Sequence, residues 1–424
     1  MKSFPDALPR LALLAILCGM VIGGLMLGFR LVVEEVQGAF LPGNNPENYE
    51  ALGALWRVVL PVAGGLALGV LLQRLPTGAR EVGPAHVIDC LERSGGRMPA
   101  RNAVVQFGGG ALSIIAGHSV GREGPAIHLG AASASLIGQA LGLSDAHLRV
   151  LVACGVAAAI AGSFNTPLAG VIFAMEVVLM EYSVLGFAPV ILAAVSATAL
   201  NRLVYGTDPA FVMPALALRS LWELPYVLAV GIAVGVVSSA FIALLGLCAA
   251  RAGRTPYWLS ATLGGIAVGV CALPCPQVMG IGYDTVNLAL LGELSLATLA
   301  TVTLFKLLAT TVGVGLGLPG GLIGPMLLIG AAAGGALGIV GAWIAPGYAS
   351  SAGFYALIGM GAMMAGTLHA PLAALTAMLE LTGNPNIIWP GMLAAIAAYG
   401  TSRDVFRQQP VFLALLGARR ESRD

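Results

Sequence analysis

Charged residues are scarce in this chain. Asp, Glu, Lys and Arg make up 10% of its 424 residues, whereas an average soluble domain has about 25%. The apolar content of 58% excludes a disordered protein. Lys plus Arg number 21 against 20 Asp plus Glu, so the basic surface of a nucleic-acid binder is also missing. What remains is a polytopic membrane protein.

The sequence also lacks the patterns of a disulfide framework or a metal site. Most of its six cysteines lie in apolar runs, where a thiol packs as a small hydrophobic group. Cys271 and Cys275 have no second Cys pair or His cluster near them. We therefore expect neither a bound metal nor a cofactor.

The longest stretch without Asp, Glu, Lys or Arg runs from Leu307 to Leu379. A spanning helix needs only about 20 apolar residues, so this stretch must contain several helices, and the whole chain about ten to fourteen membrane segments. We expect breaks in it at Gly320 and Gly321, Pro325, Pro346 and Pro371. The other uncharged runs are Leu11–Gly28, Val58–Leu72, Asn102–Gly121, Gly124–Leu143, Val150–Met175, Ser183–Asn201, Pro225–Ala250 and Thr255–Tyr283. Residues 1–424 are thus expected to form one transmembrane domain.

Short polar segments separate these runs and carry the orientation signal. We expect linkers at Asn44–Glu50, Gly78–Arg101, Thr207–Glu223 and Arg251–Arg254. More spans follow Leu11–Met26 at once, which favours a membrane helix over a removable signal peptide there. Basic residues flank both ends of the chain, so the positive-inside rule places both termini in the cytoplasm. These residues are Lys2, Arg10, Arg403, Arg407, Arg419, Arg420 and Arg423, and Arg93, Arg97 and Arg101 form a third basic group.

The chain contains an internal repeat. Residues 121–132 and 321–332 share three Gly, one Pro and two Ala at an offset of 200. Residues 155–176 and 359–380 match at an offset of 204. We place the two halves at roughly residues 55–205 and 225–405, a plan that is common among secondary transporters and related channels.

Both repeats carry the pattern Gly-x-x-Gly-Pro, at Gly121–Pro125 and Gly321–Pro325. Pro is tolerated in the first turn of a helix, and Gly lets the backbone approach an ion. The free N–H groups and the macrodipole make this end of a helix positive. Two such ends that converge would bind an anion without a basic side chain.

A few ionisable residues interrupt the apolar runs. Glu123 stands beside the proposed anion site, where its carboxylate could occupy the place of the anion. Protonation would then release the side chain from the site. Alternatively, Glu123 and Arg122 merely cap a helix. Glu176 and Glu380 occupy equivalent repeat positions, which favours a structural role such as bonding to loop amides. Lys306 is expected to snorkel to an interface or to pair with a carboxylate. His128 and His369 are interpreted as core groups.

These motifs resemble those of the CLC family of chloride channels and transporters. Residues 121–125 resemble its GREGP signature, and residues 319–325 resemble its PGGxFxP signature, with Ile323 in place of Phe. The segments Gly162–Glu176, Lys306–Thr310 and Gly282–Tyr283 are also similar to family segments. The resemblance covers roughly residues 55–418.

The resemblance implies a fold and a site. The fold would be an all-α, inverted-repeat bundle of tilted and broken helices, in a homodimer with one anion path per subunit. Glu123 would be the gating and proton-carrying residue, and Arg122 would shape the outer entrance. Backbone that faces the anion would come from Gly124, Leu322, Ile323 and Gly324, and Phe412 would stand where the family has a pore Tyr.

The sequence departs from the family at three places. The GSGIP motif, expected at Arg80–Pro84, lacks the Ser that contacts the ion. Phe412 lacks the hydroxyl of the pore Tyr. Val177 replaces the second Glu that often follows the residue matching Glu176 in proton-coupled members. For this last reason we favour a channel or uncoupled conductor over a proton–anion antiporter.

The prediction is therefore chloride transport through a CLC-type pore in a bacterial inner membrane. We expect chloride, and protons if transport is coupled, as partners. We expect neither nucleic-acid binding nor enzymatic activity. A cation-coupled solute transporter would instead need a carboxylate cluster at the midplane. An intramembrane enzyme would need a pair such as Ser119 with His118 or His128. No nucleotide-binding regulatory domain is expected after Phe412.

Overall fold

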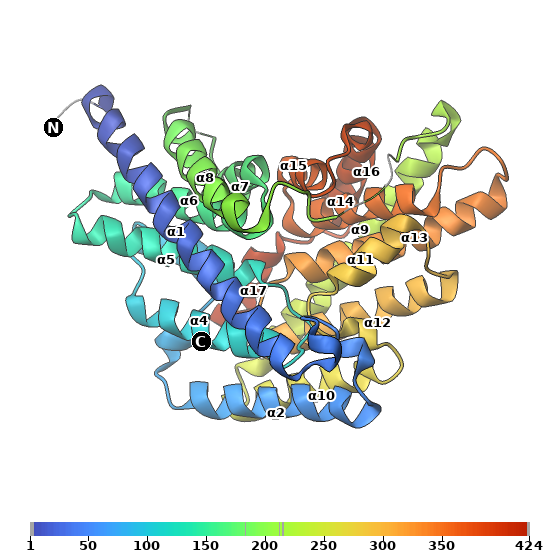
Figure 1. Ribbon diagram of the computed structural model, residues 1–424, viewed down its shortest axis with the longest axis horizontal. Helices are drawn as coiled ribbons and strands as arrows, with labels where there is room; N and C mark the ends of the chain where they lie inside the picture. The colour runs from blue at the N-terminus through green and yellow to red at the C-terminus, as the bar shows by residue number, and fades with distance from the viewer. Residues whose placement is uncertain (1–3, 183, 212, 214–215, 422–424) are drawn as a thin grey trace.

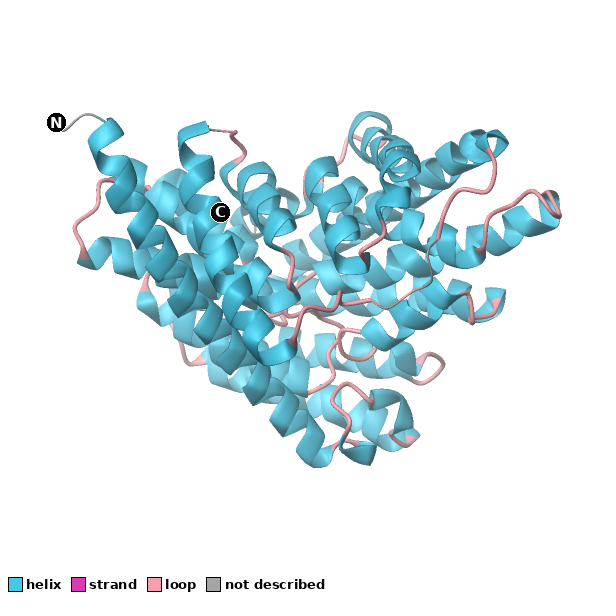
Figure 2. Cartoon of the chain, turned by 45° about the horizontal axis from the view of Figure 1, so that its top comes forward, coloured by secondary structure: helices cyan, strands magenta, loops and turns pink. Residues whose placement is uncertain are grey.

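The computed structural model describes residues 4–182, 184–211, 213 and 216–421, and this part of the chain is helical without strands. Lys2, Arg423 and Ser183, which enter the predictions above, lie outside the described residues. Figure 1 shows most helices of the first half on the left and most of the second half on the right, with α17 returning to the left, and Figure 2 shows helices joined by short loops. The α-helices are α1 (Phe4–Phe40), α2 (Ala54–Gln73), α3 (Pro84–Arg93), α4 (Ala100–Ile115), α5 (Glu123–Ala140), α6 (Asp145–Phe164), α7 (Pro167–Phe173), α8 (Val184–Tyr205), α9 (Leu224–Ala252), α10 (Tyr257–Ala272), α11 (Tyr283–Leu291), α12 (Leu296–Gly315), α13 (Ile323–Ile344), α14 (Ala352–Leu368), α15 (Pro371–Thr382), α16 (Ile388–Gly400) and α17 (Val411–Glu421).

The helices repeat with the offsets found in the sequence. Helices α5 and α13 begin 200 residues apart, at Glu123 and Ile323. Helices α6 and α14 end at left-handed residues 204 apart, Asn165 with φ 58° and His369 with φ 55°. The prediction of an inverted-repeat, all-helical membrane fold is therefore confirmed.

The predicted breaks explain why many helices are short. Seven helices among the described residues are long and apolar enough to cross a membrane, and four further apolar helices are shorter. The run Val150–Met175 is divided between α6 and α7, because the left-handed Asn165 ends one helix and Pro167 begins the next. The expected break at Pro325 was wrong: Pro325 lies in the first turn of α13, where no intrahelical N–H bond is lost.

Glycine lets the central helices of each half touch backbone to backbone. A Cβ on Gly130 of α5 would lie 2.3 Å from the carbonyl oxygen of Gly155 on α6. The equivalent Cβ on Gly330 of α13 would lie 2.4 Å from the oxygen of Gly359 on α14. Close contact between small residues is a main source of packing energy within a bilayer, so part of the glycine excess stabilises the two helix pairs.

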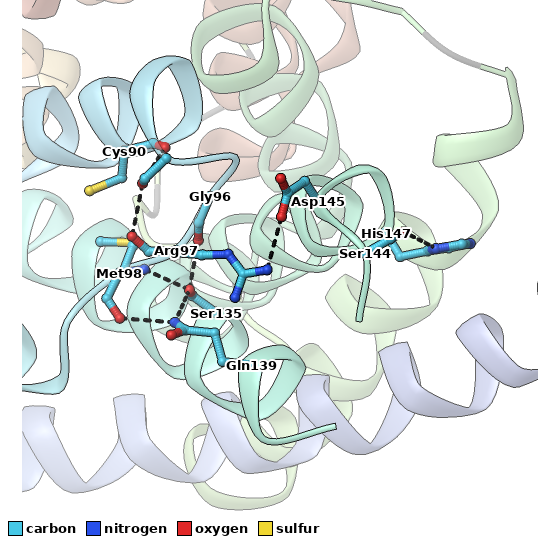
Figure 3. Close-up of polar contacts among 10 residues, drawn as sticks. Cys90, Gly96, Arg97, Met98, Ser135, Gln139, Ser144, Asp145 and His147 are labelled. Carbon is cyan, nitrogen blue, oxygen red and sulfur yellow. Dashed lines mark hydrogen bonds and ion pairs between the residues drawn. The ribbon is translucent and has the colours of Figure 1, made fainter. Parts of the chain in front are cut away.

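The segment Gly78–Arg101 is not a linker throughout, and this expectation was wrong. It contains the ten-residue helix α3, whose charged face hides the helix from a search for uncharged runs. The turn after α3 is fixed to α5 by Ser135, whose hydroxyl donates to the Gly96 carbonyl at 2.6 Å and accepts from the Met98 N–H at 2.9 Å (Figure 3). Helix α3 is therefore held rigidly against the first half.

Helix α17 also returns to α3. Arg420 of α17 forms ion pairs with Asp89 and Glu92 of α3. The hydrogen bond to Asp89 raises the pKa of the Arg420 guanidinium. Two of the basic segments used for the orientation argument thus lie together in space.

Glu176 and Glu380 join the two halves reciprocally, as their equivalent positions predict. Glu176, in the π-helical turn η4 (Ala174–Leu179), accepts from the N–H groups of Leu372 at 3.3 Å and Ala373 at 2.6 Å. Glu380 accepts from those of Leu168 at 3.0 Å and Ala169 at 2.7 Å. The predicted structural role of both carboxylates is confirmed, although the amides they bond lie in the first turns of α15 and α7 rather than in loops.

We expect Glu380→Gln to destabilise the protein by about 2 kcal/mol, the range of a hydrogen bond to a charged group. The amide NH₂ would face one of the two N–H donors at the start of α7. Thermal unfolding in detergent measures the change, and Glu176→Gln should behave alike. The exposed Glu293→Gln is the matched control; equal melting temperatures for Glu380→Gln and Glu293→Gln would contradict the role of the carboxylate.

The expectation for Lys306 was wrong. Its side chain is fully buried, and its Nζ donates to the carbonyl oxygens of Val278 at 3.0 Å and Gly280 at 2.8 Å. It neither reaches an interface nor forms an ion pair within 4.0 Å among the described residues. Lys306 instead fixes the loop that leads into α11.

Candidate functional site

The two glycine-rich turns meet in space. Gly121 and Gly321 form an antiparallel bridge, in which each N–H donates to the other's carbonyl oxygen at 2.8 and 2.7 Å. Helices α5 and α13 begin two residues after these glycines. The positive ends of two long helices are therefore brought to one point, as the paired motifs predict.

The carboxyl group of Glu123 lies at this point. The Glu123 side chain is 3% exposed. Its Oε1 accepts a hydrogen bond of 2.9 Å from the hydroxyl of Tyr283 on α11, and the backbone amides of Glu123 itself and of Gly324 face the carboxylate. Its other oxygen, Oε2, has no hydrogen-bond partner among the described residues. A buried carboxyl group thus sits against the converging helix ends.

Three glycines leave the room that this carboxylate occupies. A Cβ on Gly121 would lie 1.8 Å from Oε2, one on Gly321 would lie 2.6 Å from Oε2, and one on Gly324 would lie 3.0 Å from Oε1. An adjoining cavity of about 40 Å³ is lined by Glu123, Tyr283 and Ile323 among apolar side chains. The carboxylate therefore touches backbone from both repeats.

Arg122 lies on one side of Glu123, among aromatic rings and carboxylates. Its guanidinium carbon is 4.9 Å from the centre of the Phe164 ring and 5.6 Å from that of Tyr283. Its Nη1 is 4.0 Å from Oε1 of Glu34. Burial raises the pKa of the Glu47 carboxyl, in the loop after α1, and the charge of Arg122 offsets part of this rise. Arg122 thus shares the Glu34 carboxylate with Arg30, which pairs with it at 2.5 Å.

Phe412 lies in a different place from Glu123. It is 4% exposed and lines a cavity of about 300 Å³ together with Leu322, Gly320, Pro84 and Gln106. Arg80, Glu81 and Arg419 also line this cavity. The predicted site residues thus form two groups: Glu123, Gly324 and Ile323 meet at the bridge, whereas Leu322 and Phe412 border the cavity.

Sequence reasoning gave no role to Tyr283 at the site. The sequence around Gly282 and Tyr283 does not show that Tyr283 lies near Glu123, which is 160 residues away in the chain. Gln106 was also missed, because an uncharged residue within an apolar helix carries no signal of its own. Both residues emerge only from the packing of α4 and α11 against α5 and α13.

The histidines have mostly structural partners. His128 Nε2 contacts Nδ1 of His86 at 2.9 Å, while its own Nδ1 has no partner in the part of the chain that the structure describes. The Ser–His pair of the enzyme alternative is not formed: the Ser119 hydroxyl pairs with that of Thr310 at 2.8 Å, and the His118 ring contacts Ser113 and the Pro61 carbonyl.

The fold and the site define a class of protein. An inverted repeat of broken membrane helices, with helix N-termini from both halves around one buried carboxylate, is the architecture of an anion transport protein. Comparisons with known proteins agree with this class.

The voltage-gated chloride channel family matches residues 64–403. A ClcB-like chloride channel protein of Ralstonia nicotianae is 34% identical over 352 residues, which are 82% of this chain and 82% of that protein. The voltage-gated ClC-type chloride channel ClcB of Citrobacter koseri is 29% identical over 95% of this chain and 98% of its own. The crystal structure of a slow cyanobacterial Cl⁻/H⁺ antiporter is similar with a TM-score of 0.84 and 25% identity, over 96% of this chain and 97% of that chain. The chain therefore belongs to the voltage-gated chloride channel (CLC) family, as the motifs predict.

Proposed function

We propose that this CLC protein carries chloride, or a similar small anion, across the bilayer, and that Glu123 is its gate. The observation that carries the proposal is the position of the Glu123 carboxylate, which contacts Gly121, Gly321 and Gly324 at the start of two helices. A chloride ion could take this place when the carboxylate is protonated and leaves. Arg122 lies at the opening on one side, and Gly124, Leu322, Ile323, Gly324 and Phe412 are the proposed anion-facing residues.

We favour passive conduction over proton exchange. The residue after Glu176 is Val177, so this position offers no carboxylate to carry a proton. The relatives from Citrobacter koseri and from Escherichia coli are named voltage-gated chloride channels. The second candidate is a proton-coupled chloride antiporter, which the similarity to the cyanobacterial antiporter supports.

Reconstitution into liposomes with a chloride gradient tests both candidates. Passive conduction predicts chloride efflux that dissipates the gradient and drives no proton against its own gradient. Proton uptake against the proton gradient, driven by the chloride gradient and absent from liposomes without protein, would decide for the antiporter. Absence of any protein-dependent chloride flux would contradict the proposed function itself.

The protein is also proposed to act as a homodimer in the bacterial inner membrane, with both termini in the cytoplasm. The family resemblance supports the dimer, and the basic residues near both ends support the orientation. Light scattering in detergent should give a protein mass of twice 42.9 kDa; a mass of one chain would contradict the dimer.

A further inference from the structure

Tyr283 supplies a side-chain hydrogen bond to the carboxyl group of Glu123. It is the first residue of α11, and its hydroxyl donates to Oε1 of Glu123 at 2.9 Å. The other groups that face the carboxyl are backbone amides, those of Glu123 itself and of Gly324. Tyr283 is therefore a contact that a substitution can remove while the backbone around Glu123 stays in place.

The ring of Tyr283 is held by neighbours other than Glu123. Phe211 packs edge-to-face against it, with the ring centres 5.3 Å apart and the planes at 81°. Phe211 is fully buried, and its N–H donates to the carbonyl oxygen of Leu381 at 2.9 Å. The guanidinium carbon of Arg122 is 5.6 Å from the centre of the Tyr283 ring. The position of the hydroxyl is thus set by packing before it binds the carboxyl.

The backbone that leads to Tyr283 is fixed as well. The buried ammonium of Lys306 on α12 donates to the carbonyl oxygens of Val278 and Gly280, in the loop before α11. Gly282, which caps α11, has a left-handed φ of 86°, a conformation that glycine adopts without strain. A donor whose ring and backbone are both held loses little conformational freedom when it forms its bond.

Few charged groups act on this hydrogen-bonded pair. The charges that do so are those of Arg122 and Glu47. Asp284 is exposed, and the ring of His118 contacts the Pro61 carbonyl instead. The described residues of α6, α7, α13, α14 and α15 that line the adjoining cavity carry no ionisable side chain. Loss of the phenol hydroxyl leaves these charges in place, so its effect can be measured alone.

We propose that Tyr283 is a positioning residue, a latch that holds the ionised carboxylate of Glu123 in the place of the anion and sets the pH at which the gate opens. The inference rests on the proposed function, because it concerns the same carboxylate. A hydrogen bond to an ionised acceptor is about twice as strong as one to a neutral acceptor. The latch therefore favours the ionised, blocking form of Glu123 over the protonated form, and only such a difference shifts an equilibrium between two states.

Tyr283→Phe removes the hydroxyl and keeps the ring. We expect the pH of half-maximal chloride flux in liposomes to rise by about one pH unit, which corresponds to about 1.4 kcal/mol. The rise follows because a carboxylate that is held less tightly is released at a lower proton concentration. In a protein that also carries Glu123→Gln, Tyr283→Phe should leave the flux unchanged, since no carboxylate remains to be held.

Tyr355→Phe is the matched control. The hydroxyl of Tyr355 on α14 donates to Oε2 of Glu223 at 2.8 Å, so the same Tyr–Glu bond is lost away from the gate. We expect this variant to melt at a lower temperature and to keep the wild-type pH of half-maximal flux. The contrast separates the latch from the loss of a structural bond.

Phe211→Leu provides a second variant, which keeps the Tyr283 hydroxyl and removes the ring that packs against Tyr283. It should shift the pH of half-maximal flux in the same direction as Tyr283→Phe, by a smaller amount. A wild-type midpoint in both variants would overturn the proposal. A flux that Tyr283→Phe lowers equally at every pH would also overturn it, and would assign the hydroxyl to the passing chloride.

The failure of the latch differs from the failure of the proposed function. If the flux of the wild type depends on pH, that of Glu123→Gln does not, and Tyr283→Phe keeps the wild-type midpoint, only the role of Tyr283 fails. If the wild type carries no chloride, the proposed function fails and the latch with it.

Discussion

Chloride flux through the Glu123→Gln variant should no longer depend on pH. At neutral pH the flux should exceed that of the wild type by about tenfold, because the substitution removes a charged competitor and its hydrogen bond. On the proposed mechanism, the wild-type carboxylate occupies the contact between α5 and α13 and blocks the anion. The amide carries no charge and cannot be released by protonation. Glu123→Ala, which removes the group altogether, should give the same pH-independent flux.

Liposome flux measured between pH 5 and pH 8 checks this result. Glu293→Gln makes the same chemical change at an exposed position, and it should keep the pH dependence of the wild type. If the flux of the Glu123→Gln variant varies with pH as in the wild type, the proposed role of Glu123 as the gate is contradicted. That outcome would favour the alternative in which Glu123 and Arg122 merely cap a helix.

The second large effect is expected for Gly321→Ala. The added Cβ would lie 2.6 Å from the Gly124 nitrogen, 2.8 Å from the Gly121 oxygen and 2.6 Å from Oε2 of Glu123. Backbone atoms cannot move aside as a flexible side chain can, so the bridge must open. We expect chloride flux to fall at least about tenfold and stability to fall by about 1–3 kcal/mol, the usual cost of overpacking.

Gly108→Ala provides the control for this substitution. Gly108 lies within α4, and a Cβ there would meet nothing within 4 Å. Alanine is the better helix former by about 1 kcal/mol, so this variant should be at least as stable as the wild type and equally active. If the flux and melting temperature of Gly321→Ala match those of Gly108→Ala, the bridge is not required.

The sequence predicts the repeat and the meeting of its two glycine-rich turns well, because both depend on local chemistry. Gly and Pro at fixed spacing determine where α5 and α13 begin, and equal offsets imply that the two turns are related by symmetry. The reciprocal bonds of Glu176 and Glu380 follow from the same symmetry. Each of these inferences uses residue types whose backbone or charge behaviour is special.

Residues whose role depends on distant packing could not be found in this way. Lys306 has its acceptors in a loop more than 25 residues earlier, and no periodicity reveals a backbone carbonyl. Helix α3 was missed because it is short and charged. The contact of Tyr283 with Glu123 arises only when several helices converge.

The reciprocal bonds between the halves bear on how fast the protein can work. Gly121 with Gly321, Glu176 with the start of α15, and Glu380 with the start of α7 tie the repeats together at three points. Rocking of one half against the other, the usual cycle of inverted-repeat transporters, would break all three and would take microseconds to milliseconds. Rotation of the Glu123 side chain breaks none of them. On the proposed mechanism, the turnover rate is therefore set by protonation and ion arrival at Glu123 rather than by movement of the scaffold.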